Sequence, residues 1–223
     1  MHYKDIIETD EYKECLDSVH QEEPFIFVSG KAGVGKSVLV DYLQQKLKGQ
    51  NIAVVAPTGV AAINVGGQTI HSFFGFPPET LTQDKIIPKT GKARKVMDKL
   101  DLLIIDEISM VRADIMDGID TALKKNRGSE ELFGGVQILS IGDLFQLSPV
   151  VRDEEMPFFE QNYDTEYFFS AHCLKDRPYK SIMLEHVFRQ KDEDFIHILN
   201  SIRNNDNHRD SVAQINRNCY GVN

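Results

Sequence analysis

Five short apolar runs recur along the chain, separated by polar or helical stretches. They cover residues 25–28, 52–56, 102–105, 136–141 and 181–184. Runs that are apolar at nearly every position are typical of strands covered on both faces. A helical pattern over 37–48, closed by Gly49, follows the first run, and a charged helical pattern occupies 192–203. This alternation predicts an α/β fold with a mostly parallel sheet and helices on both faces.

Two segments interrupt the pattern. Residues 75–91 contain Pro77, Pro78 and Pro88, so we expect a long irregular insertion, of a kind that is usually functional or mobile. Residues 204–223 are polar and rich in Asn, and we expect them to form a linker or tail. The sequence therefore predicts one large domain over residues 1–203, a size that can bury its own core.

Charge argues against a nucleic-acid partner at first sight. The formal net charge is −9, whereas proteins that bind phosphate backbones usually carry a basic surface. One segment opposes this average, because residues 84–99 hold six basic residues and only two acidic ones. The basic positions are Lys85, Lys89, Lys92, Arg94, Lys95 and Lys99. They fit a solvated helix face as well as a binding patch, so charge neither establishes nor excludes DNA.

Other classes of protein are easier to set aside. No apolar run approaches the ~20 residues that a membrane span needs, and the polar N-terminus does not resemble a signal peptide. The three cysteines form no Cys-x-x-Cys pair, which indicates a reducing compartment and argues against a zinc site.

A glycine-rich loop joins the first apolar run to the first helical pattern. From Gly30 to Ser37 the sequence Gly-Lys-Ala-Gly-Val-Gly-Lys-Ser fits the P-loop pattern GxxxxGK[ST], in the strand-to-helix context that this motif requires. Its backbone N–H groups would bind phosphates, with Lys36 at the β- and γ-phosphates and Ser37 on Mg²⁺. We therefore expect ATP and Mg²⁺ as cofactors. The expected nucleotide-binding residues are Gly30, Ala32, Gly33, Val34, Gly35, Lys36 and Ser37.

A carboxylate pair ends the third apolar run. Asp106 would lie at the carboxyl edge of the sheet and hold Mg²⁺, and Glu107 would orient and deprotonate the attacking water. A GTPase would carry Asp-x-x-Gly here and an Asn-Lys-x-Asp guanine motif elsewhere, and both patterns are missing. A small-molecule kinase would lack the hydrolytic Glu. The pair therefore indicates NTP hydrolysis.

Further segments resemble one family. They are Ala-Pro-Thr-Gly-Val-Ala-Ala at 56–62, Gly-Gln-Thr-Ile-His-Ser-Phe-Phe at 67–74, Asp-Glu-Ile-Ser-Met-Val at 106–111, Gly-Asp-Leu-Phe-Gln-Leu-Ser-Pro-Val at 142–150 and Val-Phe-Arg-Gln at 187–190. With the phosphate loop, these segments resemble the N-terminal motor motifs of Pif-type (petite integration frequency) DNA helicases of superfamily 1B, in the usual order. The match covers roughly residues 25–203. It implies a RecA-like P-loop NTPase fold.

The resemblance also implies roles. Gln146 would sense the γ-phosphate and Arg189 would contact it, which completes a catalytic set with Lys36 and Glu107. Gln146 as a plain turn residue and Arg189 as a helix-cap ion pair are the alternatives. The residues that resemble the family's grip on single-stranded DNA are Pro57, Thr58, Gly59 and His71. A core histidine remains an alternative for His71.

Other positions leave alternatives open. Phe73, Phe74 and Phe76 could stack on bases or pack under the sheet. The basic, proline-broken stretch 75–99 falls about where the family carries a small strand-separating wedge. Tyr12 or Cys15 falls near the place where family members often have an adenine-contacting Gln, which puts adenine preference in question unless Tyr12 stacks on the base.

The resemblance predicts the first motor domain of a 5′-to-3′ DNA helicase, acting as a monomer on single-stranded DNA. The family binds ATP between two RecA-like domains, and we expect the second, with its arginine finger, to be missing from this chain. The chain alone would then hydrolyse ATP slowly. A nucleotide-switched DNA- or protein-binding ATPase that does not translocate is the alternative. The expected location is nucleoid-associated cytoplasm in a bacterium, or nucleus or mitochondrion in a eukaryote.

Overall fold

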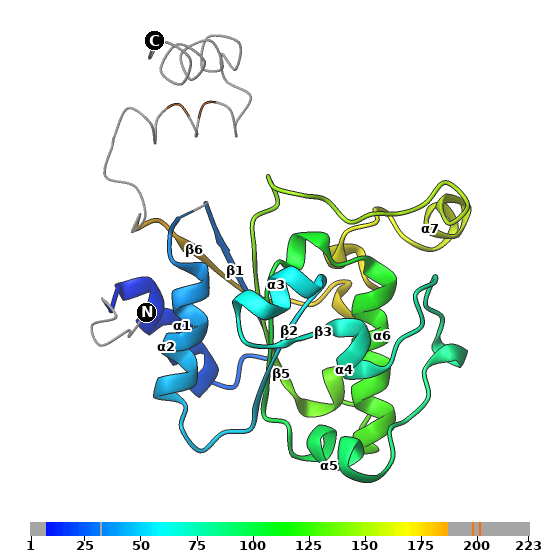
Figure 1. Cartoon of the computed structure of the whole chain (residues 1–223), viewed down its shortest axis with the longest axis horizontal. Helices are drawn as coiled ribbons and strands as arrows, with labels where there is room; N and C mark the ends of the chain where they lie inside the picture. The colour runs from blue at the N-terminus through cyan, green and yellow to red at the C-terminus, as the bar shows by residue number, and fades with distance from the viewer. Residues whose placement is uncertain (1–7, 32, 187–197, 199–200, 202–223) are drawn as a thin grey trace.

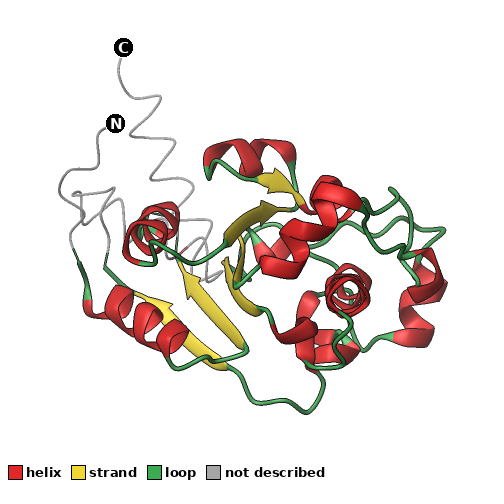
Figure 2. Ribbon diagram, turned by 90° about the horizontal axis from the view of Figure 1, so that it is seen from below, coloured by secondary structure: helices red, strands yellow, loops and turns green. Residues whose placement is uncertain are grey.

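The fold is a six-stranded parallel sheet with the order β3-β2-β4-β5-β1-β6. A computed structural model describes residues 8–31, 33–186, 198 and 201. The strands are β1 (Phe25–Gly30), β2 (Ile52–Ala56), β3 (Gln68–Thr69), β4 (Leu102–Ile105), β5 (Gln137–Gly142) and β6 (Lys180–Leu184). A parallel sheet needs crossover connections, and the helices of Figures 1 and 2 supply them.

Helices cover both faces of the sheet (Figure 1). Helices α1 (Asp10–His20) and α2 (Lys36–Lys46) cover one face. The other face carries α4 (Ile70–Phe74), α5 (Gly91–Lys99) and α6 (Ala113–Arg127). The remaining elements are α3 (Gly59–Asn64), α7 (Met156–Asn162), η1 (Gln83–Lys85), η2 (Ile108–Met110), η3 (Leu132–Gly135), η4 (Phe168–Ser170) and η5 (His172–Leu174). Among the described residues, no helix is long and apolar enough to span a bilayer.

The apolar runs become strands because successive side chains serve two cores. Along β4, Leu103 and Ile105 point into the core under α6, while Leu102 and Ile104 point into the core under α1 and α2. All four residues are fully buried. Alternation of this kind removes apolar surface from water on both faces, at about 25 cal/mol per Å².

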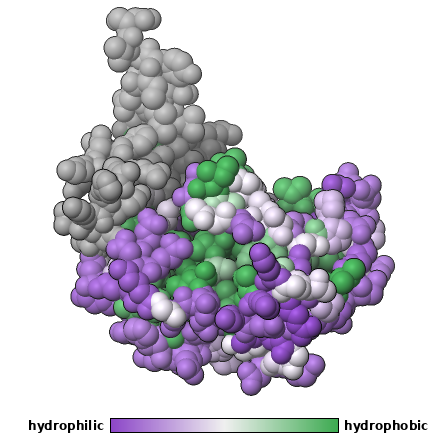
Figure 3. Space-filling view, turned by 60° about the horizontal axis from the view of Figure 1, so that its bottom comes forward, coloured by the Kyte–Doolittle hydropathy of each residue, from purple (hydrophilic) through white to green (hydrophobic). Residues whose placement is uncertain are grey.

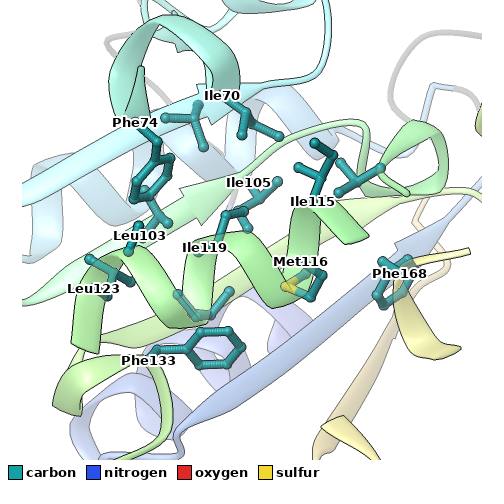
Figure 4. Packing of buried hydrophobic residues seen from close by; sticks show 14 of the residues in the cluster. Ile70, Phe74, Leu103, Ile105, Ile115, Met116, Ile119, Leu123, Phe133 and Phe168 are labelled. Carbon is teal, nitrogen blue, oxygen red and sulfur yellow. The ribbon is translucent and has the colours of Figure 1, made fainter. Parts of the chain in front are cut away.

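Helix α6 anchors the larger core. Its apolar residues recur at three- and four-residue spacing, as a buried helix face requires. Ile115, Met116, Ile119 and Leu123 face β4 and the ring of Phe133 (Figure 4). The loop after α6 is tied back through Asp120, which accepts a hydrogen bond from the Phe133 N–H at 2.7 Å.

The structure confirms the predicted α/β class and a strand at each predicted run. The helix expected over 37–48 runs from Lys36 to Lys46. Residues 75–90 are irregular apart from η1, as expected. The two-residue strand β3 was not predicted, because two residues carry no periodicity. The helix expected over 192–203 falls outside the described residues except for positions 198 and 201, and the tail 204–223 falls wholly outside them.

Three neighbouring strands bring the predicted chemistry to one edge. Strand β1 lies between β5 and β6, and β5 lies between β1 and β4. In this register Ser29 is opposite Gly142, and Ile105 is opposite Ser140. Because the strands are parallel, the segments that follow β1, β4 and β5 all emerge at the same edge of the sheet.

Candidate nucleotide and nucleic-acid site

The phosphate loop turns sharply between β1 and α2. Gly33 and Gly35 have φ of 85° and 84°, a region that glycine adopts without a Cβ clash. Gly30 has no room for a side chain, since a Cβ there would lie 2.6 Å from the Val34 Cγ2 atom. Val34 is itself buried in the core below the loop. The glycines therefore let the backbone form a close cradle that larger residues would fill.

Lys36 and Ser37 begin α2 at the mouth of this loop. The Lys36 ammonium donates hydrogen bonds to the carbonyl oxygens of Gly30 at 2.8 Å and of Lys31 at 3.2 Å. Ser37 is exposed. The N-terminus of a helix, a lysine and free-facing backbone N–H groups together favour a phosphate anion. Ala32, also predicted here, lies outside the described residues.

The carboxylate pair lies beside the loop, at the end of β4. Asp106 is 5% exposed, and its burial, together with the neighbouring Glu107 charge, raises the pKa of its carboxyl to about 6. The Lys36 charge acts in the opposite direction. The Asp106 carboxylate and the hydroxyl of Ser37, the residue after Lys36, are oxygen donors of the kind that Mg²⁺ prefers.

Glu107 adopts a left-handed backbone conformation, with φ 51° and ψ 45°. A residue other than glycine in this region costs about 1 kcal/mol or more, and such strain concentrates at functional sites. The conformation starts η2 immediately after Asp106. The side chains of these two adjacent residues therefore point in different directions. The Asp106 carboxylate is buried at the loop, and that of Glu107 is half-buried beside it.

The end of β5 completes the same edge. A Cβ on Gly142 would lie 2.8 Å from the Ile108 Cγ2 atom and 3.2 Å from the Ile108 and Ser109 nitrogens, so β5 and η2 touch. Asp143 is buried and accepts a hydrogen bond from the Gln146 side-chain amide at 3.1 Å. Gln146 is exposed, at the end of a turn closed by its N–H and the Asp143 carbonyl. Asp143 holds the glutamine and was not predicted as a site residue.

A groove of about 300 Å³ lies near the ends of β2 and β4. Three of the four residues predicted to bind nucleic acid line it, namely Pro57, Thr58 and His71. Thr58 caps α3 by accepting a hydrogen bond from the Ala61 N–H at 3.2 Å. Gly59 is exposed at the start of α3 and is not among the lining residues.

Residues that follow Glu107 also line this groove. Met110 and Arg112 line it together with His71. The Arg112 guanidinium is held by Asp114 at 2.6 Å and by Glu155 at 3.0 Å. Burial, and then the Arg112 charge, lowers the pKa of His71 below its ordinary value. The segment 106–112 thus runs from the carboxylate pair to the groove.

The aromatic residues near the groove belong to the core. Phe74 and Phe76 are buried and stack on each other with centroids 5.2 Å apart. Phe73 is partly buried against the same cluster. Of the two alternatives for these rings, packing beneath the sheet is the one that the structure supports.

Comparison with known proteins agrees with this geometry. A family model described as PIF1-like helicase matches residues 8–212. The chain belongs to this family. It is 40% identical over 186 residues to the ATP-dependent DNA helicase PIF1 of Saccharomyces cerevisiae, and the aligned region covers 80% of this chain and 21% of the relative. It is 32% identical over 205 residues to the ATP-dependent DNA helicase RRM3 of the same species, and the aligned region covers 89% of this chain and 28% of the relative.

Solved Pif1 helicases share the fold. The Bacteroides Pif1 helicase in complex with ADP-AlF3 and ssDNA superposes with a TM-score of 0.89 and 40% identity, over 96% of this chain and 50% of that one. The Candida albicans Pif1 helicase gives 0.74 and 35%, over 89% of this chain and 44% of that one. The RecA-like class is therefore confirmed. This PIF1-like chain spans about half the length of these solved chains.

One expectation about the base is wrong. Tyr12 is 1% exposed and packs against Tyr42, so its ring has no face for stacking on a base. Its hydroxyl donates a hydrogen bond to the Gly35 carbonyl. Sequence reasoning missed this contact because 23 positions separate the two residues. The motif at 187–190, with Arg189, lies outside the described residues.

Proposed function

We propose that the chain is the ATP-binding and ATP-hydrolysing motor domain of a DNA helicase, which couples hydrolysis to translocation on single-stranded DNA and to duplex unwinding. The observation that carries the proposal is the convergence of the phosphate loop, Asp106 and Glu107 at one edge of the sheet. Relatives named ATP-dependent DNA helicases, and Pif1 structures in complex with ADP-AlF3 and ssDNA or bound to ssDNA, support it.

In the proposed site, backbone N–H groups from Gly30 to Gly35, including those of Ala32, Gly33 and Val34, bind the phosphates of ATP. Lys36 leaves its carbonyl partners to pair with the β- and γ-phosphates. Ser37 and Asp106 would hold Mg²⁺, which would neutralise phosphate charge. The pKa of the Asp106 carboxyl is raised to about 6, so without a facing cation this carboxyl takes up a proton at a higher pH than an ordinary aspartate does.

Glu107 is the proposed general base. It orients the attacking water and accepts its proton as the water oxygen bonds to the γ-phosphorus. The bond from this phosphorus to the oxygen that bridges to the β-phosphate breaks, and ADP is the leaving group. Gln146, whose side-chain amide donates a hydrogen bond to Asp143, senses the γ-phosphate. Loss of this phosphate would be transmitted through Gln146 to the rest of the segment 142–150. Arg189 is proposed to contact the γ-phosphate as a permanently charged, forked donor. A second RecA-like domain would supply the remaining catalytic arginine.

Pro57, Thr58, Gly59 and His71 are the proposed contacts to single-stranded DNA. Small polar side chains and backbone donors suit contact with a sugar–phosphate backbone irrespective of sequence. The groove supports this assignment because it gathers three of the four residues. Met110, Val111 and Arg112, which follow Asp106 and Glu107 in the chain, line the same groove, so this segment is the proposed link between bound DNA and the hydrolytic site.

The proposed motor domain covers residues 1–203, with 204–223 leading toward the second domain. Within it, residues 75–99 are the proposed strand-separating wedge. A helicase must act where its DNA is, so we propose nuclear or mitochondrial action if the source is a eukaryote and nucleoid-associated action if it is a bacterium.

The deciding experiment measures the steady-state ATPase rate of the complete natural protein with and without single-stranded DNA. A motor should be stimulated manyfold. Glu107→Gln should remove at least ~10²-fold of the stimulated rate because it removes the general base, while ATP binding persists. Glu160→Gln, at an exposed position on α7, is the matched control and should behave as wild type.

A second candidate is an ATPase switch that clamps DNA or protein without moving. The ATPase rate of such a switch would be insensitive to single-stranded DNA, and that result would contradict the motor proposal. Direction is tested on duplexes that carry only a 5′ or only a 3′ single-stranded tail. Unwinding confined to the 5′-tailed duplex is the expected outcome for 5′-to-3′ movement.

A further inference from the structure

We propose that Tyr12 is a positioning residue for the phosphate loop, acting through the carbonyl of Gly35; the inference rests on the proposed ATPase function. The Tyr12 hydroxyl donates a hydrogen bond of 2.7 Å to this carbonyl oxygen. Gly35 is the last loop residue before α2 and caps that helix in the left-handed conformation. Helix α1 therefore reaches the loop at the point where its backbone changes direction.

The Gly35 carbonyl carries two hydrogen bonds. One comes from the Leu39 N–H at 2.9 Å, the first bond of α2, and the other from Tyr12. The helix already satisfies this carbonyl, so the tyrosine adds a constraint. In a planar trans peptide the C=O of Gly35 and the N–H of Lys36 point in opposite directions. Fixing the carbonyl toward Tyr12 thus fixes the Lys36 N–H on the loop's phosphate side.

Tyr12 can act as a fixed point because its surroundings are rigid. Its ring is 1% exposed and packs on Tyr42, with the centroids 5.4 Å apart. Thr9 caps α1 by accepting a hydrogen bond from the Tyr12 N–H, and Lys180 of β6 pairs with Glu14 of α1 at 2.7 Å. Burial raises the pKa of the Tyr12 hydroxyl, which keeps it protonated and able to donate.

This arrangement predicts that the Tyr12 hydroxyl contributes to nucleotide affinity independently of the base. The hydroxyl acts on the phosphate cradle, and the buried ring offers no surface to adenine or guanine. Pre-shaping the loop lowers the cost of ordering it around phosphates. Loss of the hydroxyl should therefore weaken every triphosphate ligand by the same factor.

The experiment compares Tyr12→Phe with Tyr42→Phe by titration calorimetry against Mg–ATP, Mg–GTP and Mg–tripolyphosphate. The two rings pack on each other, but the Tyr42 hydroxyl binds Glu8 and not the loop. This makes Tyr42→Phe a matched control. Tyr12→Phe should weaken all three ligands equally, by about three- to tenfold, the size expected for one lost neutral hydrogen bond. Tyr42→Phe should leave all three affinities unchanged.

Thermal unfolding of both variants separates positioning from general destabilisation. Equal losses of affinity in the two variants, in proportion to their loss in Tm, would mean a structural role and would overturn the inference. A loss confined to Mg–ATP would instead assign Tyr12 to the base. Unchanged affinities in Tyr12→Phe would also overturn the inference that Tyr12 positions the phosphate loop. If wild type binds none of the three ligands, the proposed function itself fails, which is a different result.

Discussion

His71 is the residue in the groove whose charge state matters most. It is half-buried, and the nearby charges oppose each other, with Arg112 lowering its pKa and Asp114 raising it. Glu79 also lines the groove. Burial and Arg112 prevail, so the imidazole is neutral at pH 7. A neutral ring can hydrogen-bond or stack on DNA, but it adds no counter-charge to the phosphates.

The depressed pKa makes stability depend on pH. The unfolded chain has a His71 with a pKa near ~6.5, above its folded value, so the unfolded state binds the proton more readily. His71 therefore causes no loss of stability above about pH 6.5 and an increasing loss as the pH falls below that value. His71→Gln should reduce the difference between the unfolding free energies at pH 7.5 and pH 5.5, measured with urea. An unchanged difference would contradict a half-buried His71 with a lowered pKa.

At the residue scale, the sequence predicted what is local and missed what is distant. The predictions for Lys36 and Asp106 rest on motifs that fix them relative to neighbours in the chain, and both lie at the same edge of the sheet. Stacking of Tyr12 on a base, left open from the sequence, does not occur because the ring is buried against α2, which the sequence does not place beside it. Arg112 was not predicted either, since its partner Glu155 lies 43 positions away in the sequence.

At the scale of elements, α6 organises the segment that precedes α5. Asp114 accepts a hydrogen bond from the Leu81 N–H at 2.8 Å, and Asn126 accepts one from the Lys89 N–H at 2.7 Å. The irregular stretch is thus fastened along the helix. Helix α5 buries only Met97 and exposes its other residues. The face of the molecule shown in Figure 3 is largely hydrophilic around a central apolar region. The basic positions predicted from sequence at 92–99 do share one exposed element.

If residues 75–99 act as the proposed wedge, the lysines of α5 should contact duplex phosphates at a fork. Changing Lys92, Lys95 and Lys99 to Gln in the complete natural protein should reduce unwinding and leave single-stranded DNA affinity intact. The slope of log K against log salt for a forked duplex should fall by about three, since each phosphate contact contributes close to one. The exposed control set is Lys13, Lys48 and Lys175. Equal effects of both triple variants would attribute the change to net charge alone.

Elements with a clear period were predictable, and those without one were not. The strand over 102–105 follows from four consecutive apolar residues, and its burial on both faces follows from the parallel class. Strand β3 forms because Gln68 and Thr69 lie beside Val55 and Ala56, which is a consequence of tertiary structure. The same holds for η2, whose conformation depends on the approach of Gly142.

At the scale of the molecule, the nucleotide edge is open and partly apolar. After β5, Phe145, Leu147 and Val150 are 65%, 70% and 74% exposed. Adjacent exposed apolar side chains beside a catalytic edge are typical of surfaces that another domain or molecule covers. The net charge of −9 did not identify a partner, because it is a sum over the chain and does not show that four basic residues and one acidic residue share α5. The resemblance to the family came from the order of the motifs.

The open edge leads to a prediction about residues 1–223 alone. They contain the proposed phosphate loop, Asp106 and Glu107, so Mg–ATP should bind. Turnover should be slow, because an arginine finger from a second domain is worth about 10³–10⁵ in rate in related phosphoryl-transfer enzymes. Calorimetry would measure binding, and phosphate release would measure turnover with and without single-stranded DNA. Tight binding with a low rate that DNA does not raise is expected. A rate as fast as that of the complete natural protein would mean that this domain supplies every catalytic group itself.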